Sequence, residues 1–181
     1  MITGDTYRKL VASCAGRDIV TEIPQTLVPL WCDDYYFKNP SADLVEVDLD
    51  ESATTFTYIF DINLQRVVVS FGVPTYSKHR RDASRMAGHP LSNGRNFHRG
   101  HLMAHSIGGG MDINLVPQLG RLNIGEFRVL ERKVRDLAEQ NVRCLYFVRP
   151  IYATSTQTPG MFEQCVIIPP ASVTYSLHKN I

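Results

Sequence analysis

The pattern of apolar residues predicts strands in one part of the chain and a helix in another. Between Thr55 and Val73 aromatic and β-branched residues dominate, and the polar triplet Asp61-Ile62-Asn63 interrupts them. Aromatic and β-branched residues favour strands, and a short polar interruption favours a turn. This stretch therefore predicts two antiparallel strands joined by a short turn.

A different period begins near Asn123. Apolar residues then recur at steps of three and four: Phe127, Leu130, Val134 and Leu137. This spacing is typical of an amphipathic helix, which we expect to begin near Asn123 and to end near Asn141. The apolar runs CLYFVRPIY and FEQCVIIP that follow each predict a buried strand.

The other segments are mixed or polar. Residues 5–14 have helical potential, and three prolines indicate turns: Pro24, Pro29 and Pro40. Residues 77–95 are polar and basic with glycine and proline, which favours a long loop. Strands, basic loop, histidine-rich segment, helix and strands, in this order, predict an α+β domain with a mainly antiparallel sheet.

Length and composition agree with this picture. A chain of 181 residues is long enough for one domain and too short for two ordinary ones. Its 44% hydrophobic and 20% charged residues are typical of a soluble globular protein. No apolar run approaches the roughly 20 residues that cross a bilayer, and the first 18 residues lack the apolar stretch of a signal peptide. We expect a soluble protein without membrane contacts, which a specialised secretion system would have to carry if it is exported.

The net charge of +1 hides a strong asymmetry. Residues 1–61 carry 4 Lys and Arg against 11 Asp and Glu, or −7, whereas residues 62–181 carry 15 against 7, or +8. Only Asp82 opposes the basic residues of the stretch 78–101: Lys78, Arg80, Arg81, Arg85, Arg95 and Arg99. Such a stretch suits a polyanion such as nucleic acid, although a solvated loop would have the same composition.

Cysteine and histidine spacing bears on metal binding. The four cysteines contain no Cys-x-x-Cys pair, which argues against a zinc ribbon and leaves thiols or disulfides open: Cys14, Cys32, Cys144 and Cys165. Three histidines at spacings of three and four would share one face of a helix and suggest zinc: His98, His101 and His105. Against this, Gly100 weakens a helix there and residues 108–110 are all glycine. A zinc-stabilised interaction domain therefore remains the weaker hypothesis.

The same segment has the groups needed to hydrolyse a phosphodiester. Imidazole is half ionised near neutral pH, so His101 can take a proton from water. The Arg99 guanidinium can bind a phosphate through two hydrogen bonds. Oxygen ligands for a Mg²⁺-type ion follow within about thirty residues: Asn114, Gln118, Asn123 and Glu131.

These motifs resemble the DNA/RNA non-specific endonucleases of the ββα-metal, or His-Me finger, superfamily. The family signature is Asp-Arg-Gly-His, then Asn-x-x-Pro-Gln, then an Asn that opens a helix carrying a Glu. This chain has Arg-Gly-His at 99–101, Asn-Leu-Val-Pro-Gln at 114–118, Asn123, and Glu131 eight residues later. HRGH, the Gly-Gly-Gly run and RPIY at 149–152 are similar to nuclease toxin domains of bacterial polymorphic toxin systems.

We expect a single nuclease domain over 1–181, in which the resemblance implies a ββα-metal finger inside a core at 55–168. The motifs cover residues 98–152, and the acidic portion at 1–54 has no recognised counterpart and an unknown role. The resemblance implies a Mg²⁺ or Mn²⁺ ion held by Asn123, weakly without substrate, with Glu131 holding metal-bound waters. His101 would be the general base, Asn114 would orient the loop and the base, and Arg99 would contact a phosphate. The substrate would be DNA, with RNA as a second candidate, and a toxin would have a cognate immunity protein.

Alternatives remain at several positions. Asn123 could be an ordinary N-cap, and Glu131 could pair with arginines of its own helix. Position 98 departs from the family, because His98 stands where an aspartate is usual. Asp112 would replace that carboxylate or cap the turn, and Gln118 is a further accessory candidate. A nucleic-acid-binding module without catalysis is the main competing hypothesis.

Overall fold

The computed structural model describes residues 2–14, 17–51, 54–78 and 96–181. An antiparallel sheet runs through its centre in the order β1-β2-β3-β6-β7-β8. The strands span Leu44–Glu51 (β1), Thr54–Asp61 (β2), Arg66–Gly72 (β3), Leu145–Ile151 (β6), Met161–Ile168 (β7) and Ser172–Lys179 (β8). The predicted α+β class with a mainly antiparallel sheet is therefore confirmed, as is the β2–β3 hairpin.

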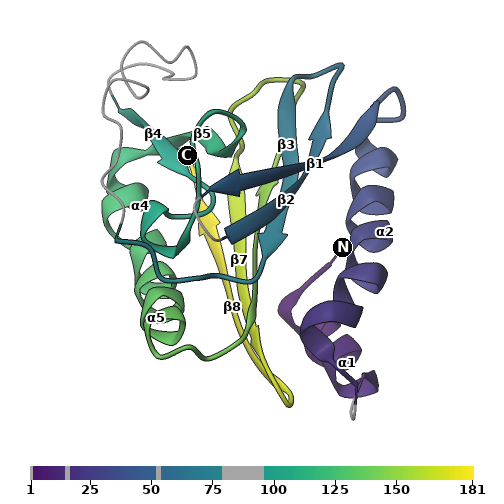
Figure 1. The fold of residues 1–181 in the computed structure, drawn as a ribbon. Helices are drawn as coiled ribbons and strands as arrows, with labels where there is room; N and C mark the ends of the chain where they lie inside the picture. Colours follow the sequence, from purple (N-terminus) through teal and green to yellow (C-terminus); the bar gives the residue numbers. More distant parts are fainter. Residues whose placement is uncertain (1, 15–16, 52–53, 79–95) are drawn as a thin grey trace.

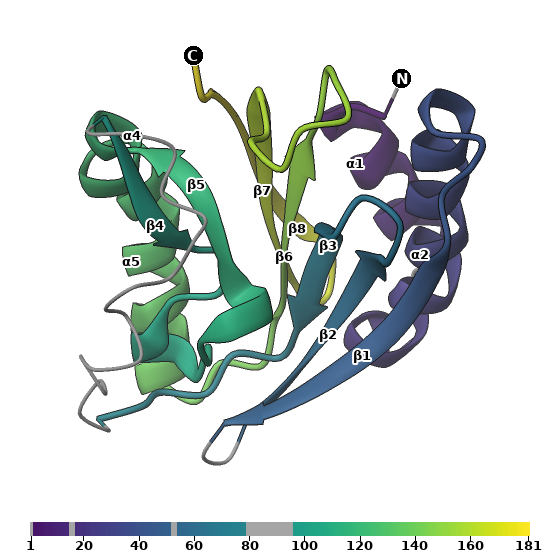
Figure 2. The ribbon, with the colours of Figure 1, turned by 90° about the horizontal axis from the view of Figure 1, so that it is seen from above.

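The two faces of the sheet carry different layers (Figures 1 and 2). Helices α1 (Gly4–Ser13) and α2 (Ile19–Lys38) cover one face. The other face carries a small hairpin of β4 (Phe97–His101) and β5 (Leu115–Leu119), together with α4 (Gly120–Ile124) and α5 (Phe127–Glu139). We call residues 96–139 the finger.

Two apolar cores lie on the two faces of the sheet. Trp31 of α2 packs against Phe147, while Phe127 of α5 packs edge-on against Phe162. Successive residues of β6 alternate between the cores, since Phe147 belongs to the first and Tyr146 and Val148 to the second. A strand covered on both faces is apolar throughout, which explains the unbroken run in CLYFV.

Several predictions from the sequence were wrong. Pro24 and Pro29 do not mark turns, because both lie inside α2, where burial of Leu27 and Trp31 against the sheet outweighs the weak helical propensity of proline.

The turn at Pro40 is confirmed. Strands β1 and β8, the two edges of the sheet, were not predicted. The loop expected at 77–95 lies largely in 79–95, outside the described residues.

The predicted helix from Asn123 to Asn141 is two helices. Helix α4 ends at Ile124 and α5 begins at Phe127, with Gly125 between them at φ −107° and ψ −110°. These angles lie outside the helical region. Apolar spacing alone did not show this break, because Phe127 to Leu137 keep a helical period and only Gly125 interrupts the backbone.

Asn180, just after β8, connects the finger to the rest of the molecule. Its Oδ1 accepts from the Leu119 backbone N–H at 2.8 Å, and its Nδ2 donates to the carbonyls of Pro117 at 3.1 Å and Pro159 at 2.7 Å. The side chain is buried. One residue therefore joins β5, the end of the main sheet and the loop after β6.

Two general properties of the chain also follow from the structure. All four cysteines are free thiols, with Cys144 and Cys165 buried. Among the described residues, no helix has the length and apolarity needed to cross a membrane.

Candidate active site

The finger is built from an antiparallel hairpin followed by a helix. In it, His98 pairs with Gln118 and His101 with Leu115, so that the Arg-Gly-His and Asn-x-x-Pro-Gln motifs form two adjacent strands. Helix α4 follows β5 directly. The geometry is a ββα unit, and it explains why the two motifs come together although twelve residues separate them.

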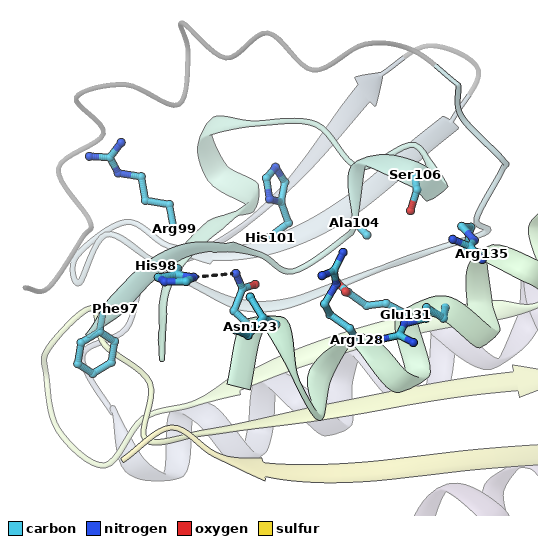
Figure 3. Close-up of a pocket in the computed structure, with 12 residues that line it drawn as sticks. Phe97, His98, Arg99, His101, Ala104, Ser106, Asn123, Arg128, Glu131 and Arg135 are labelled. Carbon is cyan, nitrogen blue, oxygen red and sulfur yellow. Dashed lines mark hydrogen bonds between the residues drawn. The ribbon is translucent and has the colours of Figure 1, made fainter. Parts of the chain in front are cut away.

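A pocket of about 630 Å³ lies between the hairpin and the two finger helices (Figure 3). Its lining includes five residues predicted from the sequence: His98, Arg99, His101, Asn123 and Glu131. They come from three elements, since the first three belong to β4, Asn123 to α4 and Glu131 to α5. The structure thus collects an imidazole, an amide oxygen, a carboxylate and a guanidinium around one space.

His101 ends β4 and is 8% exposed. The backbone just after His101 is fixed by a hydrogen bond, in which the Leu102 N–H donates to the Asn114 carbonyl at 2.9 Å. The strand and the following loop fix the backbone of His101, and the burial of its ring restricts the rotamers that the side chain can adopt. Its position suits proton transfer to or from a group inside the pocket.

Asn114 does not line this pocket. It is fully buried, and its Oδ1 accepts from the Met103 N–H at 2.8 Å. Its Nδ2 donates to the carbonyls of Met103 and Gly110, each at 2.7 Å. The side chain therefore braces the loop between β4 and β5 directly behind His101. The loop needs its glycines, because Gly108 has φ 90° and a Cβ at Gly109 would collide with the Met103 carbonyl.

Asn123 and Glu131 reach the pocket from different helices, because of the break at Gly125. The expectation that they lie two turns apart on one continuous helix was wrong. The alternative that Asn123 is an N-cap is also wrong, since it lies inside α4, whose N-cap is Leu119. Asn123 Nδ2 lies 3.3 Å from His98 Nδ1, and its oxygen points away from that ring (Figure 3).

The donor set suits a hard divalent cation. Amide and carboxylate oxygens are the ligands that Mg²⁺ and Mn²⁺ prefer, and Asn123 and Glu131 bring one of each to the same wall. No group of three His, Cys, Asp or Glu side chains that could hold a metal ion occurs among the described residues. His105 opens a 3-10 helix and is absent from the pocket lining.

Three arginines of α5 complete the pocket wall: Arg128, Arg132 and Arg135. Positions i, i+4 and i+7 share one face of a helix. From the sequence, Arg128 and Arg135 were expected only as ion-pair partners of Glu131. Their spacing could have identified them as a shared face, because the apolar residues Phe127, Leu130 and Val134 form a different, buried face of α5. Asp136 holds the Arg135 guanidinium through hydrogen bonds of 3.1 and 2.7 Å and raises its pKa.

A buried hydrogen-bonded chain lies beneath Glu131. Burial, followed by the nearby Glu131 charge, raises the pKa of Tyr146 well above its usual range. The Tyr146 hydroxyl accepts from Gln164 Nε2 at 2.8 Å, and Gln164 Oε1 lies 2.9 Å from His178 Nε2. Glu131 therefore stands over a neutral phenol in the sheet.

The remaining candidates lie elsewhere. Gln118 is buried against Gly100, where a Cβ would collide with its side chain. Asp112 lines a separate hollow beside Arg66 and Tyr152. Lys78 lies 5.6 Å from the centre of the Tyr76 ring. The other basic-loop candidates lie outside the described residues: Arg80, Arg81, Arg85 and Arg95.

Comparison with solved structures shows the same fold. One match is described as "Structure of Sda1 nuclease with bound zinc ion", at 16% identity and a TM-score of 0.50, covering 77% of this chain and 84% of that one. Another is an extracellular endonuclease, at 18% identity and a TM-score of 0.51, covering 78% of this chain and 91% of that one. No curated protein matches the chain.

The family assignment comes from a sequence model. The model described as DNA/RNA non-specific endonuclease matches residues 63–167, which is more than half of the chain. The match includes the hairpin, both finger helices and strands β3, β6 and most of β7. The chain therefore belongs to the DNA/RNA non-specific endonuclease family, and it is a nuclease.

Proposed function

We propose that this nuclease hydrolyses phosphodiester bonds of DNA with a divalent cation, Mg²⁺ or Mn²⁺, and that RNA is a second substrate. The observation that carries the proposal is the shared pocket of His101, Asn123 and Glu131. A base, two oxygen ligands and neighbouring guanidinium groups are together the parts that phosphodiester hydrolysis requires.

His101 acts as the general base in this proposal. Its ring takes the proton from the attacking water and stays in place because β4 and the Asn114 brace fix its backbone. Asn114 is therefore a positioning residue, since it contacts the loop and not the pocket.

Asn123 would hold the cation through its amide oxygen, and Glu131 would orient the waters around it. When bound, the cation supplies positive charge for the phosphate and the departing oxygen. A neutral amide contributes less to cation affinity than a carboxylate, so we expect the ion to be held weakly without substrate.

Arg99 and the α5 arginines bind the phosphates on either side of the bond that breaks. Guanidinium groups pair with phosphate oxygens through two hydrogen bonds. Contacts to phosphates carry no base information, which accounts for cleavage without sequence preference. The basic residues at 78–95 suit the same polyanionic substrate by their charge.

We further propose a role as a bacterial toxin or effector, based on the resemblance of HRGH, the glycine run and RPIY to toxin nucleases. A cognate immunity protein would then cover the basic pocket with an acidic surface. Expression in bacteria should stop growth in the wild type and not in His101→Ala. Equal growth inhibition by both would contradict the toxin role of the nuclease activity.

The direct test is cleavage of plasmid DNA and of RNA with Mg²⁺, Mn²⁺ or Zn²⁺ and with chelator. Zn²⁺ belongs in the series because a nuclease of this fold has been solved with zinc. We expect cleavage in Mg²⁺ or Mn²⁺, none with chelator, and losses of about 10²–10⁴-fold in His101→Ala. Asn123→Ala should lose activity as well.

His105→Ala is the matched control, because it removes an imidazole outside the pocket. Its activity should equal that of the wild type. Full cleavage by both His101→Ala and Asn123→Ala would overturn the proposal. Nucleic-acid binding without cleavage under any metal would favour the binding module, and stoichiometric zinc in the purified protein would favour a zinc-stabilised domain.

A further inference from the structure

His98 stands at the position where an aspartate is usual, and its contact with Asn123 shows what it does there. The 3.3 Å contact joins His98 Nδ1 to Asn123 Nδ2. An amide nitrogen only donates hydrogen bonds, so His98 Nδ1 must accept.

The imidazole fits closely against the start of α4. A Cβ at Gly120, the first residue of that helix, would lie 2.7 Å from His98 Nε2 and 3.0 Å from its Cε1. Glycine at 120 therefore lets the ring approach the helix that carries Asn123. The junction is fixed as well, since the Gly120 N–H donates to the Asn96 carbonyl at 2.9 Å and the Leu119 N–H to Asn180.

We propose that His98 is a positioning residue for the cation site, because it selects one of the two orientations of the Asn123 carboxamide. The two ends of an amide have nearly the same shape and opposite polarity. With Nδ2 held by His98, the oxygen faces the pocket, on the side of Arg128 and Glu131 (Figure 3). The reversed amide would direct N–H groups at a cation. This inference rests on the proposed role of Asn123 as the cation ligand.

The comparison with aspartate explains why histidine works here. His Nδ1, an Asp carboxylate oxygen and the Asn Oδ1 are all bonded to Cγ, so each can place an acceptor at the same point. Leucine has a methyl group there and no acceptor. His98→Asn therefore keeps a hydrogen-bond acceptor next to Asn123, and His98→Leu removes it.

The test is titration of the full-length protein with Mn²⁺ alone, with free Mn²⁺ measured by electron paramagnetic resonance. We expect His98→Leu to weaken Mn²⁺ binding about 10-fold, the usual effect of losing a residue that orients a metal ligand. His98→Asn should bind as the wild type does. Gly120→Ala should weaken binding in the wild type, because its Cβ displaces the ring, but not further in His98→Leu.

A double-mutant cycle separates orientation from general damage. Asp at position 123 has two oxygens and no orientation to choose, so His98→Leu should cost no Mn²⁺ affinity in an Asn123→Asp background. Equal losses in both backgrounds, equal behaviour of His98→Asn and His98→Leu, or no Mn²⁺ binding by the wild type would each overturn the inference. Failure of the proposed function would give a different result: the variants would bind Mn²⁺ as the double-mutant cycle predicts, but the wild type would not cleave nucleic acid.

Discussion

Arg149 and Glu163 face each other on β6 and β7 and form an ion pair, with 3.3 Å between Arg149 Nε and Glu163 Oε2. They are 5% and 2% exposed. The hydroxyls of Tyr7 and Tyr175 donate to the two carboxylate oxygens at 3.0 Å, and Arg149 donates to Asp34 of α2 at 2.7 Å. Arg149, the first residue of RPIY, therefore belongs to the scaffold that joins the N-terminal helices to the sheet.

Glu163→Gln should lower the free energy of unfolding by about 3 kcal/mol, because it removes the more deeply buried of the two carboxylates that pair with the Arg149 guanidinium. Urea denaturation measures the change. The control is Asp5→Asn, which breaks an exposed ion pair with Arg8 and should leave the midpoint nearly unchanged. A shift no larger than that of the control would contradict the prediction.

Asn114→Asp should destabilise the protein and reduce cleavage together. The variant keeps the shape of the side chain, but a carboxylate would face the Met103 and Gly110 carbonyls. Two lost hydrogen bonds and the repulsion should cost about 2–4 kcal/mol. Asn63→Asp is the control, because Asn63 makes its single amide contact at an exposed turn. Normal stability with lost activity would show instead that Asn114 acts in the chemistry itself.

Arg128→Ala with Arg132→Ala should weaken DNA binding in a His101→Ala background. If both arginines contact phosphates, the slope of log affinity against log salt should become shallower by about 1.8. Fluorescence anisotropy at several salt concentrations gives the slope. Lys133→Ala is the control on the same helix, since Lys133 bonds Thr174 and lies outside the pocket. An unchanged slope in the double variant would remove α5 from the binding surface.

The thiols should differ in reactivity. Burial raises the pKa of Cys144 to about 11, and burial with the Glu163 charge raises that of Cys165. Only the thiolate reacts, so both should resist a disulfide reagent at pH 8 while the partly exposed Cys14 reacts. All four should react in denaturant. Rapid labelling of Cys144 in the native protein would disprove this.

His178 should make the protein less stable in mild acid. Burial lowers its pKa, although the Glu126 carboxylate opposes the shift. The unfolded chain therefore takes up this proton at a higher pH than the folded chain does. The free energy of unfolding should fall as the pH drops below about 6.5, and the fall should be smaller in His178→Gln. If the free energy of unfolding fell equally with pH in the wild type and in His178→Gln, His178 would not be the group responsible.

The residue pattern of a short segment predicted those strands whose formation depends mainly on that segment's own sequence. The β2–β3 hairpin and strands β6 and β7 contain runs of aromatic and β-branched residues, and such runs favour buried strands. Strands β1 and β8 form the sheet edges and carry more exposed residues than the inner strands, so their apolar signal is weak. Helix α2 contains two prolines, and only its packing against the sheet keeps it helical.

The candidate site was predicted in part for the same reason. Motif spacing identified His101, Asn123 and Glu131, and the structure brings all three to one pocket. The motif spacing showed neither the break at Gly125, which places Asn123 and Glu131 on different helices, nor the contact of Asn123 with His98. That contact joins a strand to a helix and has no local pattern in the sequence.

The three hydrogen bonds of Asn180 limit how this nuclease can admit a duplex. Because they fasten β5 to the main sheet and to the loop after β6, they oppose movement of the finger away from the sheet. We therefore expect a strand of nucleic acid to be accommodated by rotamer changes of the long side chains that line the pocket. Rotamer changes of exposed side chains take picoseconds to nanoseconds, whereas hinge motions of domains take microseconds to milliseconds.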